Sequence, residues 1–149
     1  VSPRGGEPGF VHVLDDTQLA MPDRPGNNLI DTLSNIALSP SVGLPFFVPG
    51  FEEMLRVNGV AKTVTDPEMM ERFTVDGKKP RSVMLIEVRE VFFHCTKALK
   101  RSGLWDASKH VPRETMPSFG QIVRDQMKLP VAADLIDTAL EDDAKKNLY

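Results

Sequence analysis

The sequence predicts a mainly β domain with flanking helices, arranged as a small antiparallel barrel of the α+β class. Short apolar segments are joined by turn residues as in hairpins, and helical segments are few. No strand alternates regularly with a long helix, as it would around a parallel sheet. The glycine-rich fingerprints GxGxxG and GxxxxGK followed by Ser or Thr do not occur. An antiparallel β-barrel is therefore expected in place of a Rossmann sheet.

The chain begins with a predicted hairpin. Residues 10–14 and 19–21 are apolar segments, and the polar residues 15–17 between them supply the turn. Pro22 is expected to end the hairpin, because proline lacks the backbone N–H that a strand ladder uses.

Two further strands are predicted after the first helix. Residues 42–48 form an apolar run in which Pro45 indicates a sheet edge or a bulge. Residues 54–64 alternate in character, so Arg56 points away from the side of Leu55.

A long strand is predicted over residues 82–95, which are rich in Val, Ile and Phe. Glu87 and Arg89 have the same parity as Val91 and Phe93, so the burial pattern changes sides midway. A bulge or barrel corner near Arg89 would explain this change.

Apolar periodicity and cap or stop residues predict five helices. They cover residues 28 to the stop at Pro40, 66–73, 97–102, 118–127 and 130–145. Thr96 is expected to cap the third helix and Gly103 to end it. The last helix carries one apolar stripe, made of Ala132, Leu135, Ile136, Ala139 and Leu140. Residues 106–117 form a loop, so 118–149 is expected to be a C-terminal helical extension of a single domain over 1–149.

Composition argues against several classes of protein. The formal net charge of −3 and the pI near 5.6 argue against a nucleic-acid binder. A single cysteine, Cys95, excludes an internal disulfide and a multi-cysteine zinc site, and it fits a reducing cytosol. No run approaches the roughly 18 apolar residues that span a bilayer. Residues 2–6 read as the end of a strand, so we expect an N-terminal strand or helix to be missing from this chain.

Segment 22–28 resembles an anion site on a stiff turn. Arg24 offers a planar fork of donors, Gly26 lets backbone approach a ligand, and a helix start near Asn28 presents unpaired N–H groups. A phosphate suits all three features. The alternative is ordinary turn and helix-cap chemistry, which uses the same residue types.

A second basic group follows the long strand. On a helix, Lys97, Lys100 and Arg101 share one face, where an anion would relieve their mutual repulsion. Trp105 offers a flat surface for stacking on an aromatic ligand. The alternative is a solvated basic face with a tryptophan packed beneath it.

No metal site and no catalytic residue is assigned. His94 and Cys95 point to opposite faces of a strand, and a buried free cysteine is usually inert. Arg4, Arg24 and Arg56 lie on or beside separate strands, and converging in a groove they would clamp a phosphate and a polar ring edge. Because no acid pair or Ser/His/Asp order is present, a cofactor is expected to supply the chemistry.

Several pieces taken in order carry a resemblance that covers most of residues 1 to 106. They are Ser2-Pro3-Arg4-Gly5, Pro8-Gly9-Phe10-Val11, Pro22-Asp23-Arg24-Pro25-Gly26-Asn27-Asn28, Pro49-Gly50, Leu55-Arg56-Val57-Asn58-Gly59, and the block from His94 that ends Arg101-Ser102-Gly103-Leu104-Trp105. The chain resembles the pyridoxamine 5′-phosphate oxidase-like, FMN-binding split barrels, and specifically a bacterial subgroup of probable FMN-dependent enzymes.

The resemblance implies a homodimeric split β-barrel that holds FMN between subunits. It implies a cofactor-binding set of Ser2, Arg4, Met21, Pro22, Arg24, Asn27, Asn28, Arg56, Lys97, Arg101 and Trp105. Within that set, Arg4, Arg24, Asn27 and Asn28 would hold the phosphate, and Met21 and Pro22 would border the flavin. Arg56 would approach the polar edge of the ring, while Lys97, Arg101 and Trp105 would come from the partner subunit or its rim.

The chain departs from the oxidase proper at two places. Asn27 and Asn28 replace an Arg-Lys pair, and the C-terminal Trp and Arg segment that binds substrate in the oxidase has no clear counterpart. These departures argue against pyridoxamine phosphate oxidation. We therefore expect a cytosolic FMN-dependent oxidoreductase that acts on a small molecule. The alternatives are a non-catalytic flavin- or haem-binding module and a deazaflavin-dependent reductase.

Overall fold

The computed structural model describes residues 1–26 and 29–147. The chain divides into two compact units, Val1–Trp105 and Asp106–Tyr149. Each unit is described by itself.

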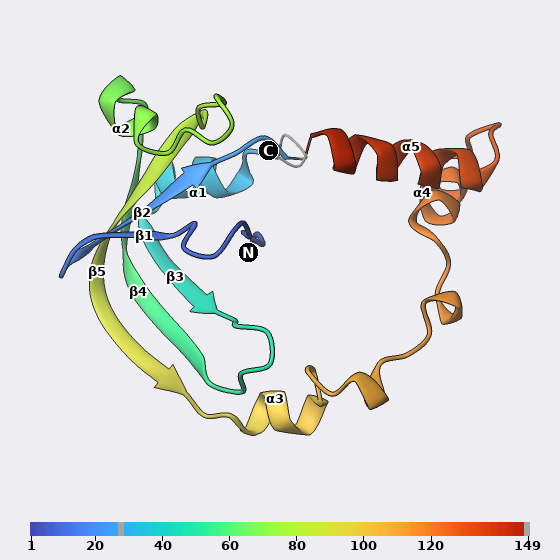
Figure 1. Ribbon diagram of the computed structural model, residues 1–149, viewed down its shortest axis with the longest axis horizontal. Coiled ribbons are helices and arrows are strands. Elements are labelled where there is room, and N and C mark those ends of the chain that lie inside the picture. The colour runs from blue at the N-terminus through green and yellow to red at the C-terminus, as the bar shows by residue number, and fades with distance from the viewer. Residues whose placement is uncertain (27–28, 148–149) are drawn as a thin grey trace. The chain divides into compact units, whose positions relative to one another are not determined.

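The first unit is built on one five-stranded antiparallel sheet with the order β1-β2-β5-β4-β3 (Figure 1). The strands are β1 His12–Asp15, β2 Gln18–Asp23, β3 Ser41–Phe46, β4 Met54–Val64 and β5 Ser82–His94. This antiparallel sheet with flanking helices confirms the predicted fold class, an α+β split barrel.

The hairpin at the start of the chain is confirmed, but β2 runs one residue beyond the predicted stop. Pro22 lies within β2 and is paired with Val83 of β5. On the other side of β2, the pairing with β1 reaches only Ala20. Pro22 therefore lies where β2 has a single neighbouring strand, and an open edge of this kind tolerates proline. Pro45 obeys the same rule, because β3 is the last strand of the sheet.

The predicted bulge in the long strand is also confirmed. Asn58 is paired with Glu90 and Gly59 with Val88, so Arg89 is the extra residue in β5. The two strands approach closely here, because a Cβ on Gly59 would collide with the carbonyl oxygen of Glu87.

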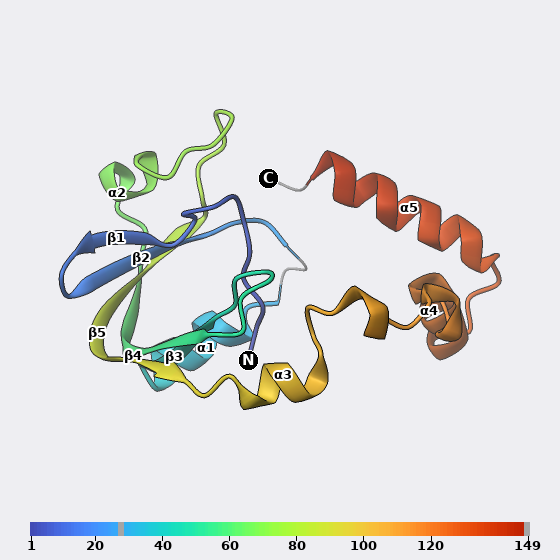
Figure 2. The ribbon, with the colours of Figure 1, turned by 60° about the horizontal axis from the view of Figure 1, so that its bottom comes forward.

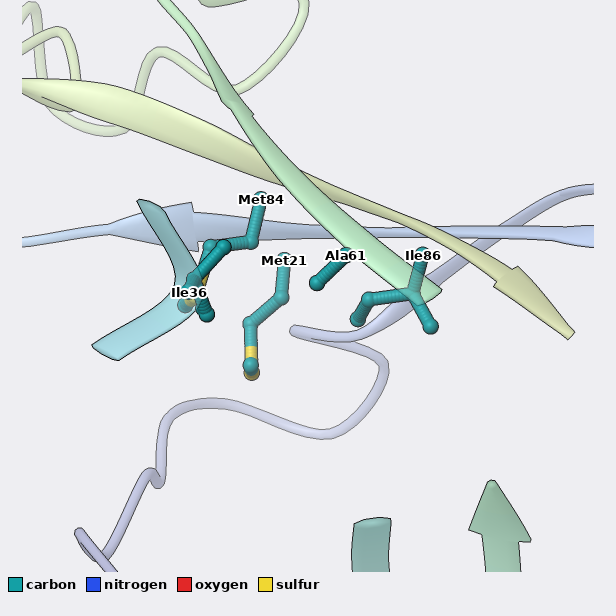
Figure 3. Close-up of a cluster of buried hydrophobic side chains, with 5 residues drawn as sticks. All are labelled: Met21, Ile36, Ala61, Met84 and Ile86. Atoms are coloured by element: carbon teal, nitrogen blue, oxygen red, sulfur yellow. The ribbon is translucent and has the colours of Figure 1, made fainter. Parts of the chain in front are cut away.

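The sheet has a core on each face. On one face, helix α1 Asp31–Leu38 contributes to a cluster made of Met21, Ile36, Ala61, Met84 and Ile86 (Figure 3). On the other face, Ala20 and Val83 pack with Phe73, near helix α2 Pro67–Glu71. Figures 1 and 2 show both helices beside the sheet, where α1 contacts β4 and α2 contacts β5.

The boundaries of the five helices lie within three residues of the predicted ones. Helix α1 begins at Asp31 after Ile30, which makes no side-chain cap; the predicted start at Asn28 lies outside the described residues. Helix α3 Lys97–Ser102 ends as predicted at Gly103, which has a φ of 59°. The capping hydrogen bond predicted for the Thr96 hydroxyl is absent from α3.

Over residues 106–147, the second unit contains two helices, α4 Phe119–Met127 and α5 Ala133–Lys146, after the short 3-10 turns Ala107–Lys109 and Arg113–Thr115 (Figure 2). Ser118 and Gln121 form a reciprocal capping box at the start of α4. The backbone N–H of Gly120 donates to Asp137 Oδ1 over 2.6 Å, which ties α4 to α5.

The apolar stripe predicted on the last helix is not buried within this unit. Leu135 is 63% exposed and Leu140 is exposed as well. The cause is the small partner surface that α4 offers, since Gly120 is its only buried residue. The extent of the helical extension as a domain boundary stays a prediction.

Candidate cofactor-binding site

Three side chains form a continuous polar chain across β4 and β5. Arg56 Nε donates to Asn58 Oδ1 over 2.9 Å, and Asn58 Nδ2 donates to Glu90 Oε2 over 2.8 Å. Arg56 and Asn58 are two apart on β4 and therefore share a face. Glu90 reaches them because it is directly opposite Asn58 in the register of β5. We call Arg56, Asn58 and Glu90 the Arg56 network.

Neighbouring strands support the Arg56 guanidinium from two sides. A Cβ built on Gly43 of β3 would lie 3.4 Å from Arg56 Nη2 and 3.2 Å from Asn58 Oδ1. A Cβ at this position would thus press on Asn58 Oδ1 and would be in ordinary van der Waals contact with the guanidinium. On the β5 side, Arg56 Cζ lies 5.9 Å from the centroid of the Phe92 ring. Within residues 1–26 and 29–147, neither Nη1 nor Nη2 of Arg56 has a hydrogen-bond partner. These groups can donate to a ligand that carries acceptor atoms.

The Arg56 network lies on the sheet face opposite the Figure 3 cluster. Ala61 and Val57 of β4 are buried on the cluster side, and Arg56 has the opposite parity. The Arg89 bulge brings Glu90 to the side of Arg56. Arg56 and Glu90 are exposed and Asn58 is half-buried, so the site is open to solvent.

A second group gathers where β2 ends and α1 begins. Arg4 Nη1 lies 2.8 Å from Asp23 Oδ1, and both side chains are partly buried. Ser2 Oγ lies 2.7 Å from Thr32 Oγ1 in the first turn of α1. The structure thus brings Ser2 and Arg4 to the neighbourhood of segment 22–28. Asp23 was not identified from the sequence as a partner of Arg4; its place beside the candidate cation Arg24 was the only signal.

The remaining phosphate candidates are placed differently. Arg24 Nη2 donates to the carbonyl oxygen of Phe73 over 2.9 Å. Arg24 follows Asp23, the partner of Arg4, directly in the chain. Asn27 and Asn28 lie outside the described residues.

Met21 and Pro22 are buried in this single chain. The Met21 side chain is 7% exposed and points into the cluster of Figure 3. Their role at the border of a flavin stays a prediction.

The α3 region holds the other three predicted residues. Arg101 Nε donates to the carbonyl oxygen of Lys97 over 3.2 Å, and Lys97 and Arg101 are both exposed. The indole of Trp105 is half-buried, and its Nε1 donates to the carbonyl oxygen of Phe51 over 2.6 Å. This bond fastens the end of the first unit to the turn between β3 and β4. Lys100, by contrast, forms an ion pair with Glu52, which already balances its charge.

Other titratable groups do not extend the site. Cys95 is exposed, which corrects the sequence argument that treated it as buried. No group of three metal-ligating side chains is found among the described residues. Hydrogen bonds lower the pKa of three carboxyls, those of Asp15, Asp106 and Asp137, chiefly through Thr17, Ser108 and Ser118 respectively. Asp15 and Asp106 belong to turns, and Asp137 accepts from the backbone N–H of Gly120 at the start of α4.

Comparison with known proteins adds the family. No curated protein matches the chain. Among solved structures, tagged HupZ from Group A Streptococcus is 18% identical, with a TM-score of 0.47 over 56% of this chain and 68% of that chain. A histidine-to-alanine variant of HupZ gives 18% identity and a TM-score of 0.48 over 57% and 73%. No described helix is both long and apolar enough to cross a bilayer. The family model for pyridoxamine 5′-phosphate oxidase matches residues 2–95, more than half of the sequence, and the chain therefore belongs to that family.

Proposed function

We propose that the protein is a flavoprotein that binds FMN and acts as an FMN-dependent oxidoreductase on a small molecule. The observation that supports this most is the Arg56 guanidinium, held on an open sheet face with Nη1 and Nη2 left to donate. Membership of the pyridoxamine 5′-phosphate oxidase family makes a flavin the expected ligand.

The residues present fit the ring of FMN. Asn58 holds the guanidinium through Nε, and the remaining Nη1 and Nη2 donors suit the acceptor atoms on the pyrimidine side of an isoalloxazine. Bound FMN would supply hydride transfer at N5, with negative charge growing on the pyrimidine side as it is reduced. Arg56 would stabilise that charge, and the protein would otherwise contribute position and exclusion of water.

The phosphate end would lie where β2 meets α1. This corner is on the α1 face of the sheet and Arg56 is on the opposite face, so the ring edge of the same FMN would be met by Arg56 of a second copy of the chain. Ser2 and Arg4 supply a hydroxyl and a cation beside the first turn of α1. Asp23 must then share Arg4 with the phosphate, which limits affinity. Arg24, Asn27 and Asn28 complete the proposed group, and Met21 and Pro22 would offer backbone to the ring. The neutral pair Asn27 and Asn28 argues against pyridoxamine phosphate as substrate.

We also propose a homodimer. Apolar side chains at the end of β5 and in the turn after β3 are exposed, including Phe93 at 72% and Phe51 at 61%. A second copy would cover this surface and would bring Lys97, Arg101 and Trp105 to the cofactor. The exposed thiol of Cys95 fits a reducing, cytosolic location. Light scattering that gave a monomer for the FMN-loaded protein would contradict the shared site.

The function is tested by absorption spectroscopy on the purified full-length protein, followed by titration with FMN. We expect a flavin spectrum and quenched flavin fluorescence on binding, and reduction of bound FMN by a donor such as NAD(P)H. Bound FMN that no donor reduces would favour a sensing module, and a Soret band would favour haem. Tighter binding of a deazaflavin than of FMN in competition would indicate the deazaflavin reductase instead.

A further inference from the structure

Asn58 connects two charges of opposite sign, and each end of its amide has the partner that suits it. The oxygen accepts from the Arg56 cation, and the nitrogen donates to the Glu90 carboxylate. Reversing the amide would set a donor against the guanidinium and an acceptor against the carboxylate. The two charges therefore fix the orientation of Asn58, and Asn58 in turn fixes Arg56 Nε.

This arrangement reduces the freedom of a long exposed side chain. An arginine on an open sheet samples many rotamers, and holding it in one of them before a ligand arrives lowers the entropy lost on binding. Gly43 and Phe92 bound the guanidinium on either side, and Asn58 holds it through Nε. The fork that remains, Nη1 and Nη2, then faces a ligand in a fixed direction.

We infer that Glu90, acting through Asn58, is a positioning residue that orients Arg56 toward the ring of FMN; this inference rests on the proposed function. It predicts an effect of unusual sign. FMN is an anion, so removing a nearby carboxylate should strengthen its binding if Glu90 acts only through space. If Glu90 instead positions Arg56, removing it weakens the binding of FMN.

Glu87 provides a matched control. It is an exposed carboxylate on the same strand, paired with Arg89 over 3.1 Å and outside the Arg56 network. Glu87→Ala removes the same charge from β5 and measures the effect through space. Glu90→Gln keeps an acceptor for Asn58 Nδ2 and should largely restore wild-type behaviour.

The first measurement uses the protein without FMN. The side-chain Nε–H signal of Arg56 in nitrogen-15 NMR should be protected from exchange in the wild type and in Glu90→Gln. It should lose protection in Asn58→Ala and Glu90→Ala. Unchanged protection in Glu90→Ala would overturn the inference.

The second measurement is FMN affinity and the midpoint potential of bound FMN. Glu90→Ala and Asn58→Ala should each weaken FMN binding by about threefold to tenfold, and the double variant should be no weaker than Asn58→Ala, since Glu90 acts through Asn58. If the affinity for reduced FMN falls by a further threefold to tenfold, the midpoint potential of bound FMN falls by about 15–30 mV for a two-electron couple. Glu87→Ala should leave both values near wild type or raise the affinity.

The outcomes separate this inference from the function on which it rests. Tighter FMN binding in Glu90→Ala, matching Glu87→Ala, would overturn the positioning role while leaving the flavoprotein intact. Additive losses in the double variant would do the same. A wild-type protein that binds no FMN would overturn both.

Discussion

Replacing Gly59 by alanine tests the strand geometry on which the Arg56 network depends. The added methyl group would collide with the carbonyl oxygen of Glu87 and would lie 3.0 Å from Ile86 Cγ2. The Glu87 contact is with backbone at the bulge, so no side-chain rotation relieves it. Strands β4 and β5 must separate, or the bulge must rearrange.

The size of the effect follows from two opposing terms. Overpacking of this kind costs about 1–3 kcal/mol, and a clash with backbone belongs at the upper end. Replacing glycine by alanine also stabilises by about 0.4–1 kcal/mol through the unfolded chain. We therefore expect Gly59→Ala to lower the free energy of unfolding by about 2 kcal/mol. With a urea m-value of about 2 kcal/mol/M, the midpoint would fall by about 1 M.

Trp105 makes the assay specific. It is the single tryptophan, it ends the first unit, and its indole is bonded to Phe51 of that unit. Its fluorescence during urea unfolding thus reports on the unit that contains Gly59. Gly5→Ala is the matched control, because a Cβ there meets nothing within 4 Å. A Gly59→Ala protein within about 0.5 kcal/mol of Gly5→Ala would refute the close approach at the bulge.

Three further predictions follow from the described contacts. Gly43→Ala should leave stability near wild type but weaken FMN binding about threefold to tenfold, because its methyl group would press on Asn58 Oδ1, the acceptor that holds Arg56 Nε; equal affinity by titration would contradict this. Asp23→Asn should strengthen the binding of FMN severalfold by freeing Arg4, whereas Arg4→Gln should weaken it; fluorescence titration at low salt separates the two signs. The pKa of Asp137 is lowered in the folded chain, chiefly by its hydrogen bond with the Ser118 hydroxyl. The ionised carboxylate therefore stabilises the α4–α5 pair above the ordinary pKa of 3.8, and this stabilisation is lost as the pH falls below that value. Amide exchange in α4 followed against pH should show this loss, and Asp137→Asn should abolish its pH dependence.

The fold could largely be predicted because its signals are local. Pro45 indicated an edge strand from one missing N–H, and the parity of Glu87 and Arg89 indicated a bulge within a few residues of its place. Asp66 and Pro67 likewise marked the start of α2, where Asp66 Oδ1 accepts from the backbone of Met69. Each of these features is decided by neighbours in the sequence.

The partners of the charged side chains could not be predicted in the same way. Arg4 is bonded to Asp23, and Asn58 to Glu90, across 19 and 32 residues of chain. Such pairs depend on strand register, in which a shift of one residue moves a side chain to the other face. Sequence reasoning found Arg4 and Arg56 as candidate cations but could not identify the groups that hold them.

The bulge at Arg89 decides which charge meets Asn58. In a regular ladder continuing from the Gly59–Val88 pair, Arg89 would lie opposite Asn58, and Glu90 would lie opposite Val57 on the buried side of β4. A second guanidinium would then lie beside Arg56, and the Asn58 amide would have no acceptor for its Nδ2. Like charges on neighbouring positions are unfavourable, and so is a carboxylate set against an apolar face. The extra residue removes both penalties at once, so the strand irregularity that defines this sheet is also what assembles the Arg56 network.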